Sequence, residues 1–159
     1  MKILIVSDTH GRHGNLDEVL EHEGKIDMLL HLGDVEDDEH YIEAIAECPV
    51  HILSGNNDYF SHLPGEKEIR IGKYRVFMTH GHGHYVSMNT KRLREVARAR
   101  GVDIVMFGHT HKPYMDVEGD LKVINPGSLS YPRQEGRRAS YVIMEINANG
   151  NACFKLKFV

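Results

Sequence analysis

Residues 3–6 (Ile-Leu-Ile-Val) run directly into residues 7–10 (Ser-Asp-Thr-His), and this pairing of an apolar run with a polar cluster decides the fold. A continuous apolar run of this length indicates a strand that is buried on both faces. Similar pairs begin at residues 28, 50, 76 and 104. Strands of this kind, separated by helical patterns, predict an α/β domain in which ligands bind beyond the carboxyl ends of the strands.

Apolar residues recur with helical spacing at residues 16–20, 42–46 and 93–97. Beyond residue 112 the pattern changes to short β-type stretches that are separated by turn signals, so we expect the last third of the chain to be antiparallel. No linker, low-complexity tract or repeat interrupts the sequence. We therefore predict one mixed α/β sandwich and a single domain over residues 1–159.

The composition excludes several classes of protein. The chain has 19 Lys and Arg against 23 Asp and Glu, a formal net charge of −4, which is too acidic for a protein that binds duplex DNA by neutralising phosphates. Basic residues gather on one predicted helix, but no aromatic platform for stacked bases accompanies them, so we expect no nucleic-acid partner. The first apolar run is far shorter than the roughly 20 residues of a membrane span, and we expect a cytoplasmic protein without a membrane partner.

The polar clusters that follow the strands offer ligands for metal ions. They supply carboxylate oxygen, amide oxygen and imidazole nitrogen without thiolate, a mixture that suits Mn, Fe, Zn, Ni or Co. The candidates exceed what one such ion accepts and suit two ions about 3.5–4 Å apart that share a carboxylate, for which we favour Asp34. The seven candidate ligands are Asp8, His10, Asp34, Asn56, His80, His109 and His111.

The ordered motifs resemble a known family. They are Asp-x-His at 8–10, Gly-Asp at 33–34, Gly-Asn at 55–56, His-Gly-His at 80–82 and Gly-His-x-His at 108–111. In this order they resemble the calcineurin-like metallophosphoesterase superfamily. Asn-Pro-Gly-Ser at 125–128 and Pro-Arg at 132–133 are similar to its small single-domain bacterial and archaeal phosphodiesterases. The resemblance implies two sheets packed face to face with helices outside.

The resemblance also implies a dinuclear metal centre and an activity. One ion would be held by Asp8, His10, Asp34 and His111, and the second by Asp34, Asn56, His80 and His109. The implied reaction is hydrolysis of a phosphodiester by a metal-bound hydroxide. We expect two divalent transition-metal ions, Mn²⁺ first and Ni²⁺, Fe²⁺, Zn²⁺ or Co²⁺ as alternatives, and a small phosphoester substrate. The sequence is compatible with a homo-oligomer.

Six further positions are expected to serve the substrate or the reaction. Many relatives carry a histidine after the asparagine ligand that is assigned to the leaving group, but here Asn57 stands in its place. An amide can hydrogen-bond a phosphoryl oxygen of the substrate but cannot deliver a proton. His82 is a candidate for that proton, and His13 is another. We expect Arg133 to donate to the substrate phosphate, and the loop that contains Gly127 and Ser128 to support the site and approach a phosphate through backbone N–H groups.

Two other functions compete with the phosphodiesterase. A phosphomonoesterase of the same fold differs only in how its pocket accommodates the additional charge of a monoester. A non-catalytic binding or scaffold module of this fold is the other alternative. The presence of suitable residues at all seven predicted ligand positions favours an enzyme.

Overall fold

The computed structural model describes residues 1–159 and contains ten strands, three α-helices and one short 3₁₀-helix. The first sheet consists of β1 (Lys2–Val6), β2 (Met28–His31), β3 (Val50–Ile52), β9 (Ser140–Ile146) and β10 (Ala152–Phe158). The second consists of β4 (Glu66–Ile71), β5 (Tyr74–Thr79), β6 (Ile104–Met106), β7 (Tyr114–Asp116) and β8 (Lys122–Asn125). The helices are α1 (Gly14–Glu23), α2 (Glu39–Ile45), η1 (His82–His84) and α3 (Lys91–Arg100).

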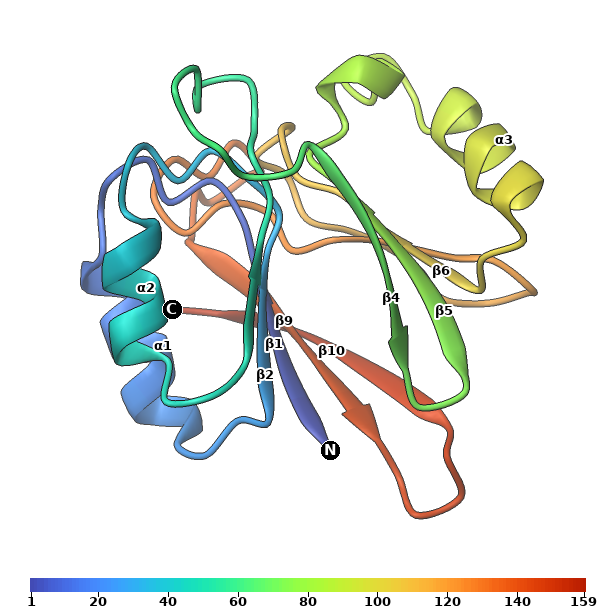
Figure 1. The fold of residues 1–159 in the computed structure, drawn as a ribbon, viewed down its shortest axis with the longest axis horizontal. Helices are drawn as coiled ribbons and strands as arrows, with labels where there is room; N and C mark the ends of the chain where they lie inside the picture. The colour runs from blue at the N-terminus through green and yellow to red at the C-terminus, as the bar shows by residue number, and fades with distance from the viewer.

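The two mixed sheets face each other and carry their helices on the outside (Figure 1). The strand order is β10-β9-β1-β2-β3 in the first sheet and β4-β5-β6-β8-β7 in the second. Helices α1 and α2 flank the first sheet, and α3 flanks the second. The predicted α/β architecture of two packed sheets flanked by helices is confirmed.

Strand β1 is a continuous apolar run because both of its faces are buried. Ile3 and Ile5 are fully buried in the core between the two sheets. Leu4 and Val6 point the other way and pack with Leu16 of α1 in a second core, where they are equally buried. Because both faces of this strand are covered, polar residues can follow only where the strand ends.

The expectation for the last third of the chain is correct for one sheet and wrong for part of the other. Strands β9 and β10 are antiparallel, and β7 pairs antiparallel with β8. Strand β8, however, lies between β7 and β6 and runs parallel to β6. An edge hairpin that folds back into the sheet produces this order, and it brings the end of β8 to the edge where β5 and β6 also end.

Strand β4 has no counterpart among the apolar runs. It pairs only with β5 and lies at the edge of its sheet, where residues 66–70 alternate between exposed and partly buried positions and only Ile71 is buried in the core. Such an edge strand needs no continuous apolar run. None of the helices is long and apolar enough to cross a membrane.

Candidate metal centre

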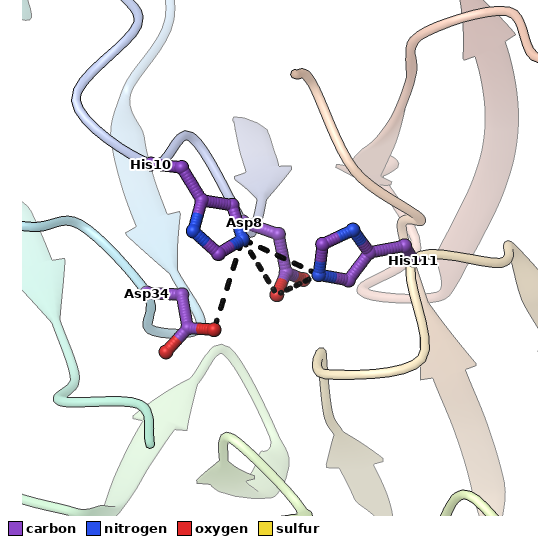
Figure 2. A group of neighbouring side chains, drawn as sticks. All are labelled: Asp8, His10, Asp34 and His111. Atoms are coloured by element: carbon purple, nitrogen blue, oxygen red, sulfur yellow. Dashed lines mark hydrogen bonds and ion pairs between the residues drawn. The ribbon is translucent and has the colours of Figure 1, made fainter. Parts of the chain in front are cut away.

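The site lies where the carboxyl ends of parallel strands from both sheets meet. Asp8 and His10 follow β1, Asp34 follows β2 and His111 follows β6. Their ligand atoms all lie within 4.8 Å of one another, and Figure 2 shows the four side chains turned toward a common point. Two carboxylates and two imidazoles at this separation could hold a divalent transition-metal ion.

A second group of side chains lies beside the first. The Oδ1 atom of Asn56 lies 3.2 Å from Nε2 of His80 and 2.8 Å from Nδ1 of His109. Oδ2 of Asp34 is 3.4 Å from Nε2 of His80 and 3.7 Å from Nε2 of His10. The structure thus brings all seven predicted ligands together, and Asp34 lies between the two groups.

Backbone carbonyl groups determine which nitrogen of two histidines carries the proton. Nδ1 of His80 donates to the carbonyl oxygen of Leu32 at 2.7 Å, and Nδ1 of His111 donates to that of Tyr131 at 2.8 Å. A carbonyl oxygen only accepts, so Nε2 of each ring presents a lone pair to the site. Histidines that bind metals through one nitrogen are usually oriented by such a bond at the other.

Glu36, which the sequence patterns did not single out, orients a third histidine. Its Oε1 atom lies 2.7 Å from Nδ1 of His10, which leaves Nε2 of His10 directed at Nε2 of His111, 3.3 Å away. Two unprotonated nitrogens this close repel each other unless a proton or a metal ion lies with them. This pair therefore fits a cation.

We expect Glu36→Gln to weaken Mn²⁺ binding about tenfold or more, because the amide still accepts the Nδ1–H of His10 but lacks the charge that makes the ring a better ligand. The measurement is calorimetric titration of metal-stripped protein with Mn²⁺. The control is Asp37→Asn, which neutralises an exposed carboxylate in the next position. Equal affinities in the two variants would contradict a role for Glu36 in orienting His10.

Asp8 provides an independent test of whether the residues fit a cation. Its side chain is fully buried, and Oδ2 accepts the backbone N–H of His109 at 3.2 Å. Oδ1 lies 3.2 Å from Nε2 of His111 but accepts no hydrogen bond while that nitrogen carries no proton. Burial alone would raise the pKa of Asp8, but His111 and His80 hold it below its ordinary value, so the group is ionised. A buried carboxylate oxygen without a donor is costly, and a bound cation removes that cost.

The electrostatics of the second group also favour positive charge. Burial lowers the pKa of His80, but the neighbouring carboxylates of Asp34 and Asp8 outweigh this effect and raise it. Burial would likewise raise the pKa of Asp34, yet His80 and the donors of Asn57 hold it well below its usual range. Both shifts describe a site in which a cation is stabilised.

Five of the seven candidate ligands have a left-handed backbone. The φ angles are +56° at Asp8, +47° at His10, +56° at Asp34, +68° at His109 and +57° at His111. Non-glycine residues rarely adopt this region, which costs about 1–2 kcal/mol per residue. Strain that is concentrated in one set of side chains is typical of a functional site.

Asn57 contacts Asp34, which the sequence did not predict. Its backbone N–H donates to Oδ1 of Asp34 at 2.9 Å and its side-chain Nδ2 donates to Oδ2 at 2.7 Å. These two hydrogen bonds position the Asp34 carboxylate. The amide has a second N–H, and its contact with a phosphoryl oxygen stays a prediction.

Gly127 and Ser128 lie in a loop that contacts Asp8. Ser128 is fully buried, and its hydroxyl group donates to the backbone carbonyl of Asp8 at 2.8 Å. The backbone N–H of Gly127 donates to Oδ1 of Asn125 at 2.8 Å, so this group is already used. The loop therefore supports Asp8 from behind, and a contact between the loop and a phosphate stays a prediction.

His82 and Arg133 lie on the open side of the site. His82 is exposed, with its ring centre 5.6 Å from that of His80. Arg133 is exposed and lines a cavity of about 730 Å³ together with His10 and His111. His13 is engaged elsewhere, with Nε2 2.9 Å from Oδ2 of Asp38.

Asp58 ties two of the site loops together and was missed by the motif analysis. Its carboxylate accepts the backbone N–H groups of Asp34, Val35, Glu36 and Gly55 at 2.8, 2.9, 2.7 and 2.6 Å. Gly55 is needed there because a Cβ atom would lie only 2.1 Å from Oδ1 of Asp34. The only sequence signal for this clamp is its place in the polar cluster at residues 54–58.

Comparison with known proteins agrees with this geometry. The family profile described as the calcineurin-like phosphoesterase superfamily domain matches residues 1–149. The chain belongs to this superfamily. The Bacillus subtilis protein named probable metallophosphoesterase YsnB is 31% identical over 92% of this chain and 85% of its own length. A Streptococcus pneumoniae structure described as a predicted phosphoesterase is 30% identical, with a TM-score of 0.82, covering 99% of this chain and 88% of that one.

Two solved structures of lower sequence identity share the fold. A structure described as a novel archaeal phosphodiesterase is 23% identical, with a TM-score of 0.71, covering 99% of this chain and 100% of that one. Vps29 of Entamoeba histolytica, solved in complex with Zn²⁺, is 24% identical, with a TM-score of 0.77 and 99% of each chain covered. At these identities the likeness concerns the fold alone.

Proposed function

We propose that this calcineurin-like phosphoesterase is a dinuclear metal-dependent phosphodiesterase that acts on a small phosphoester. The observation that carries the proposal is the convergence of seven oxygen and nitrogen ligands in two groups that share Asp34. Two ligand sets that share a carboxylate suit two ions that lie close enough together for two-ion hydrolysis of a phosphoester.

In this proposal some residues bind the ions and others orient the ligands or the substrate. Asp8, His10, Asp34 and His111 would hold one ion, and Asp34, Asn56, His80 and His109 the other. Bound ions of this kind lower the pKa of water and offset charge on the phosphoryl oxygens. The protein orients the ligands through Glu36, Asn57 and the carbonyl groups behind the imidazoles, and Arg133 offers a forked donor to the substrate phosphate from the open side.

Asn57, the residue after Asn56, cannot protonate a leaving alkoxide, because its side chain is an amide that contacts Asp34. We therefore propose that the enzyme favours esters with good leaving groups, or that His82 supplies the proton from the rim. Under either alternative we expect the enzyme to hydrolyse a phosphodiester faster than a phosphomonoester. The archaeal phosphodiesterase of the same fold is consistent with that order.

Metal removal and return tests this proposal. We expect metal-stripped protein to lose hydrolysis of bis-p-nitrophenyl phosphate, and Mn²⁺ to restore it by about a hundredfold or more. The rates with the diester and with p-nitrophenyl phosphate are compared under the same conditions. Activity that persists after stripping would overturn the metal mechanism, and a faster rate with the monoester would favour the phosphomonoesterase.

The second candidate is a non-catalytic module. Since a Vps29 of this fold was solved with Zn²⁺, metal binding alone does not separate the two functions, but hydrolysis does. Protein that binds Mn²⁺ and hydrolyses neither ester would favour the binding module.

A further inference from the structure

The open side of the metal centre leads into a cavity of about 730 Å³, which we call the cationic cavity. Its lining includes His10, His111, Tyr131, Arg133 and Arg137. The size lies within the range of small-ligand pockets and exceeds the space that one phosphate group needs. A substrate whose scissile phosphate lies at His10 and His111 therefore extends into this cavity.

The lining of the cationic cavity is positively charged, whereas the chain as a whole is negatively charged. The protein as a whole carries a formal net charge of −4, yet the cavity has no carboxylate in its lining and contains the guanidinium groups of Arg133 and Arg137. Arg12 lies over the ring of Tyr131, with its Cζ atom 4.5 Å from the ring centre, and adds a third guanidinium beside the same wall. The edge of this cavity is therefore suited to an anion that the metal centre does not itself hold.

Tyr131 joins this surface to the metal centre. Its carbonyl oxygen accepts the proton of His111 Nδ1, and its ring packs against His10 with centres 5.2 Å apart. The backbone N–H of Arg133 donates to the carbonyl of His111 at 2.9 Å. The segment that carries the arginines is thus fixed directly to two candidate metal ligands, and the two anion sites have a defined separation.

We propose that the cationic cavity binds a second phosphate group of the substrate, so that the enzyme prefers phosphodiesters that carry an additional phosphomonoester. Forked guanidinium donors match phosphate oxygens in pairs, and Arg137 is the partner for the charged phosphomonoester because Arg133 serves the scissile phosphate. This inference rests on the proposed phosphodiesterase function and names its substrate class.

A pair of substrates with the same scissile bond tests the proposal. One is the 5′-(p-nitrophenyl phosphate) of thymidine, and the other is the same ester with an added 3′-phosphate. We expect kcat/KM of the Mn²⁺-loaded enzyme to be about tenfold higher for the 3′-phosphorylated ester, and Arg137→Ala to remove most of this preference. The preference is also expected to shrink as salt concentration rises.

The matched control is Arg138→Ala. Arg138 is the next residue and equally exposed, but its guanidinium lies over Phe158, with Cζ 5.1 Å from the ring centre, and donates to the carbonyl of Val159. This variant is expected to keep the full preference. A wild-type enzyme that does not distinguish the two esters, or a preference that survives Arg137→Ala, would overturn the proposal.

A binding measurement keeps this test distinct from that of the proposed function. Calorimetry of the Mn²⁺-loaded protein with thymidine 3′,5′-bisphosphate and thymidine 5′-monophosphate needs no turnover. Tighter binding of the bisphosphate that depends on Arg137 would support the cavity even if neither ester were hydrolysed. Equal binding of both nucleotides by wild type would refute the cavity even if hydrolysis were observed.

Discussion

Asp34→Asn is expected to reduce kcat for bis-p-nitrophenyl phosphate by about a thousandfold, equivalent to about 4 kcal/mol of transition-state stabilisation. Asp34 lies between the two ligand groups, with Oδ2 within 3.7 Å of His10 and 3.4 Å of His80. Asparagine keeps the size of the side chain but removes its charge. The replacement therefore removes the anionic bridge without opening a cavity.

The side chain at position 34 is also expected to lose its orientation in the Asp34→Asn variant. Both carboxylate oxygens of Asp34 accept N–H groups of Asn57, and one of these donors would face the new amide NH₂ group. A donor that faces a donor has no hydrogen bond, and the side chain is expected to turn. Metal analysis after dialysis against Mn²⁺ should show fewer ions bound per chain than the two expected for wild type.

Asp37→Asn provides the matched control for this loss. Asp37 is exposed, lies three residues beyond Asp34 and has a φ of +66°, a conformation that asparagine tolerates well. The charge change is identical, and activity close to wild type is expected. If Asp34→Asn kept wild-type activity and the full metal content, Asp34 would not bridge the ions and the two-ion mechanism would fail.

The placement of the ligands could be predicted because it follows from strand direction. Parallel strands end at the same edge, so polar residues after β1, β2, β3, β5 and β6 must meet if those strands pack in two facing sheets. His31 lies within β2 rather than after it and is not one of the seven candidate ligands. That residue is fully buried, its Nε2 lies 3.0 Å from Oγ1 of Thr9, and burial lowers its pKa to about 4, so it is a neutral core histidine.

The contacts that the sequence patterns did not predict span long separations in sequence. Ser128 supports Asp8 from 120 positions away, and Asn57 turns toward Asp34 from the next site loop. Local spacing contains no information about which loops lie against each other at one edge.

Asp58→Asn is expected to lower the free energy of unfolding by about 3 kcal/mol and to impair the site as a consequence. The carboxylate of Asp58 accepts four backbone N–H groups, three from residues 34–36 and one from Gly55. Hydrogen bonds to an ionised acceptor contribute about 1.5–3 kcal/mol each, and the partial exposure of Asp58 reduces the sum. Asparagine retains one acceptor oxygen and places an NH₂ group against the remaining N–H donors.

The measurement is urea unfolding of metal-stripped protein, because a bound ion would add its own binding free energy to the stability of the folded state. Asp103→Asn serves as the control. Asp103 is similarly half-buried but its carboxylate accepts a single backbone N–H, that of Arg75 at 2.7 Å, so a loss of only about 1 kcal/mol is expected. Equal losses in the two variants would mean that the four N–H groups are satisfied without Asp58. A large loss for Asp58→Asn alone, accompanied by weaker Mn²⁺ binding, would show that one carboxylate outside the ligand set holds the loops that carry the ligands.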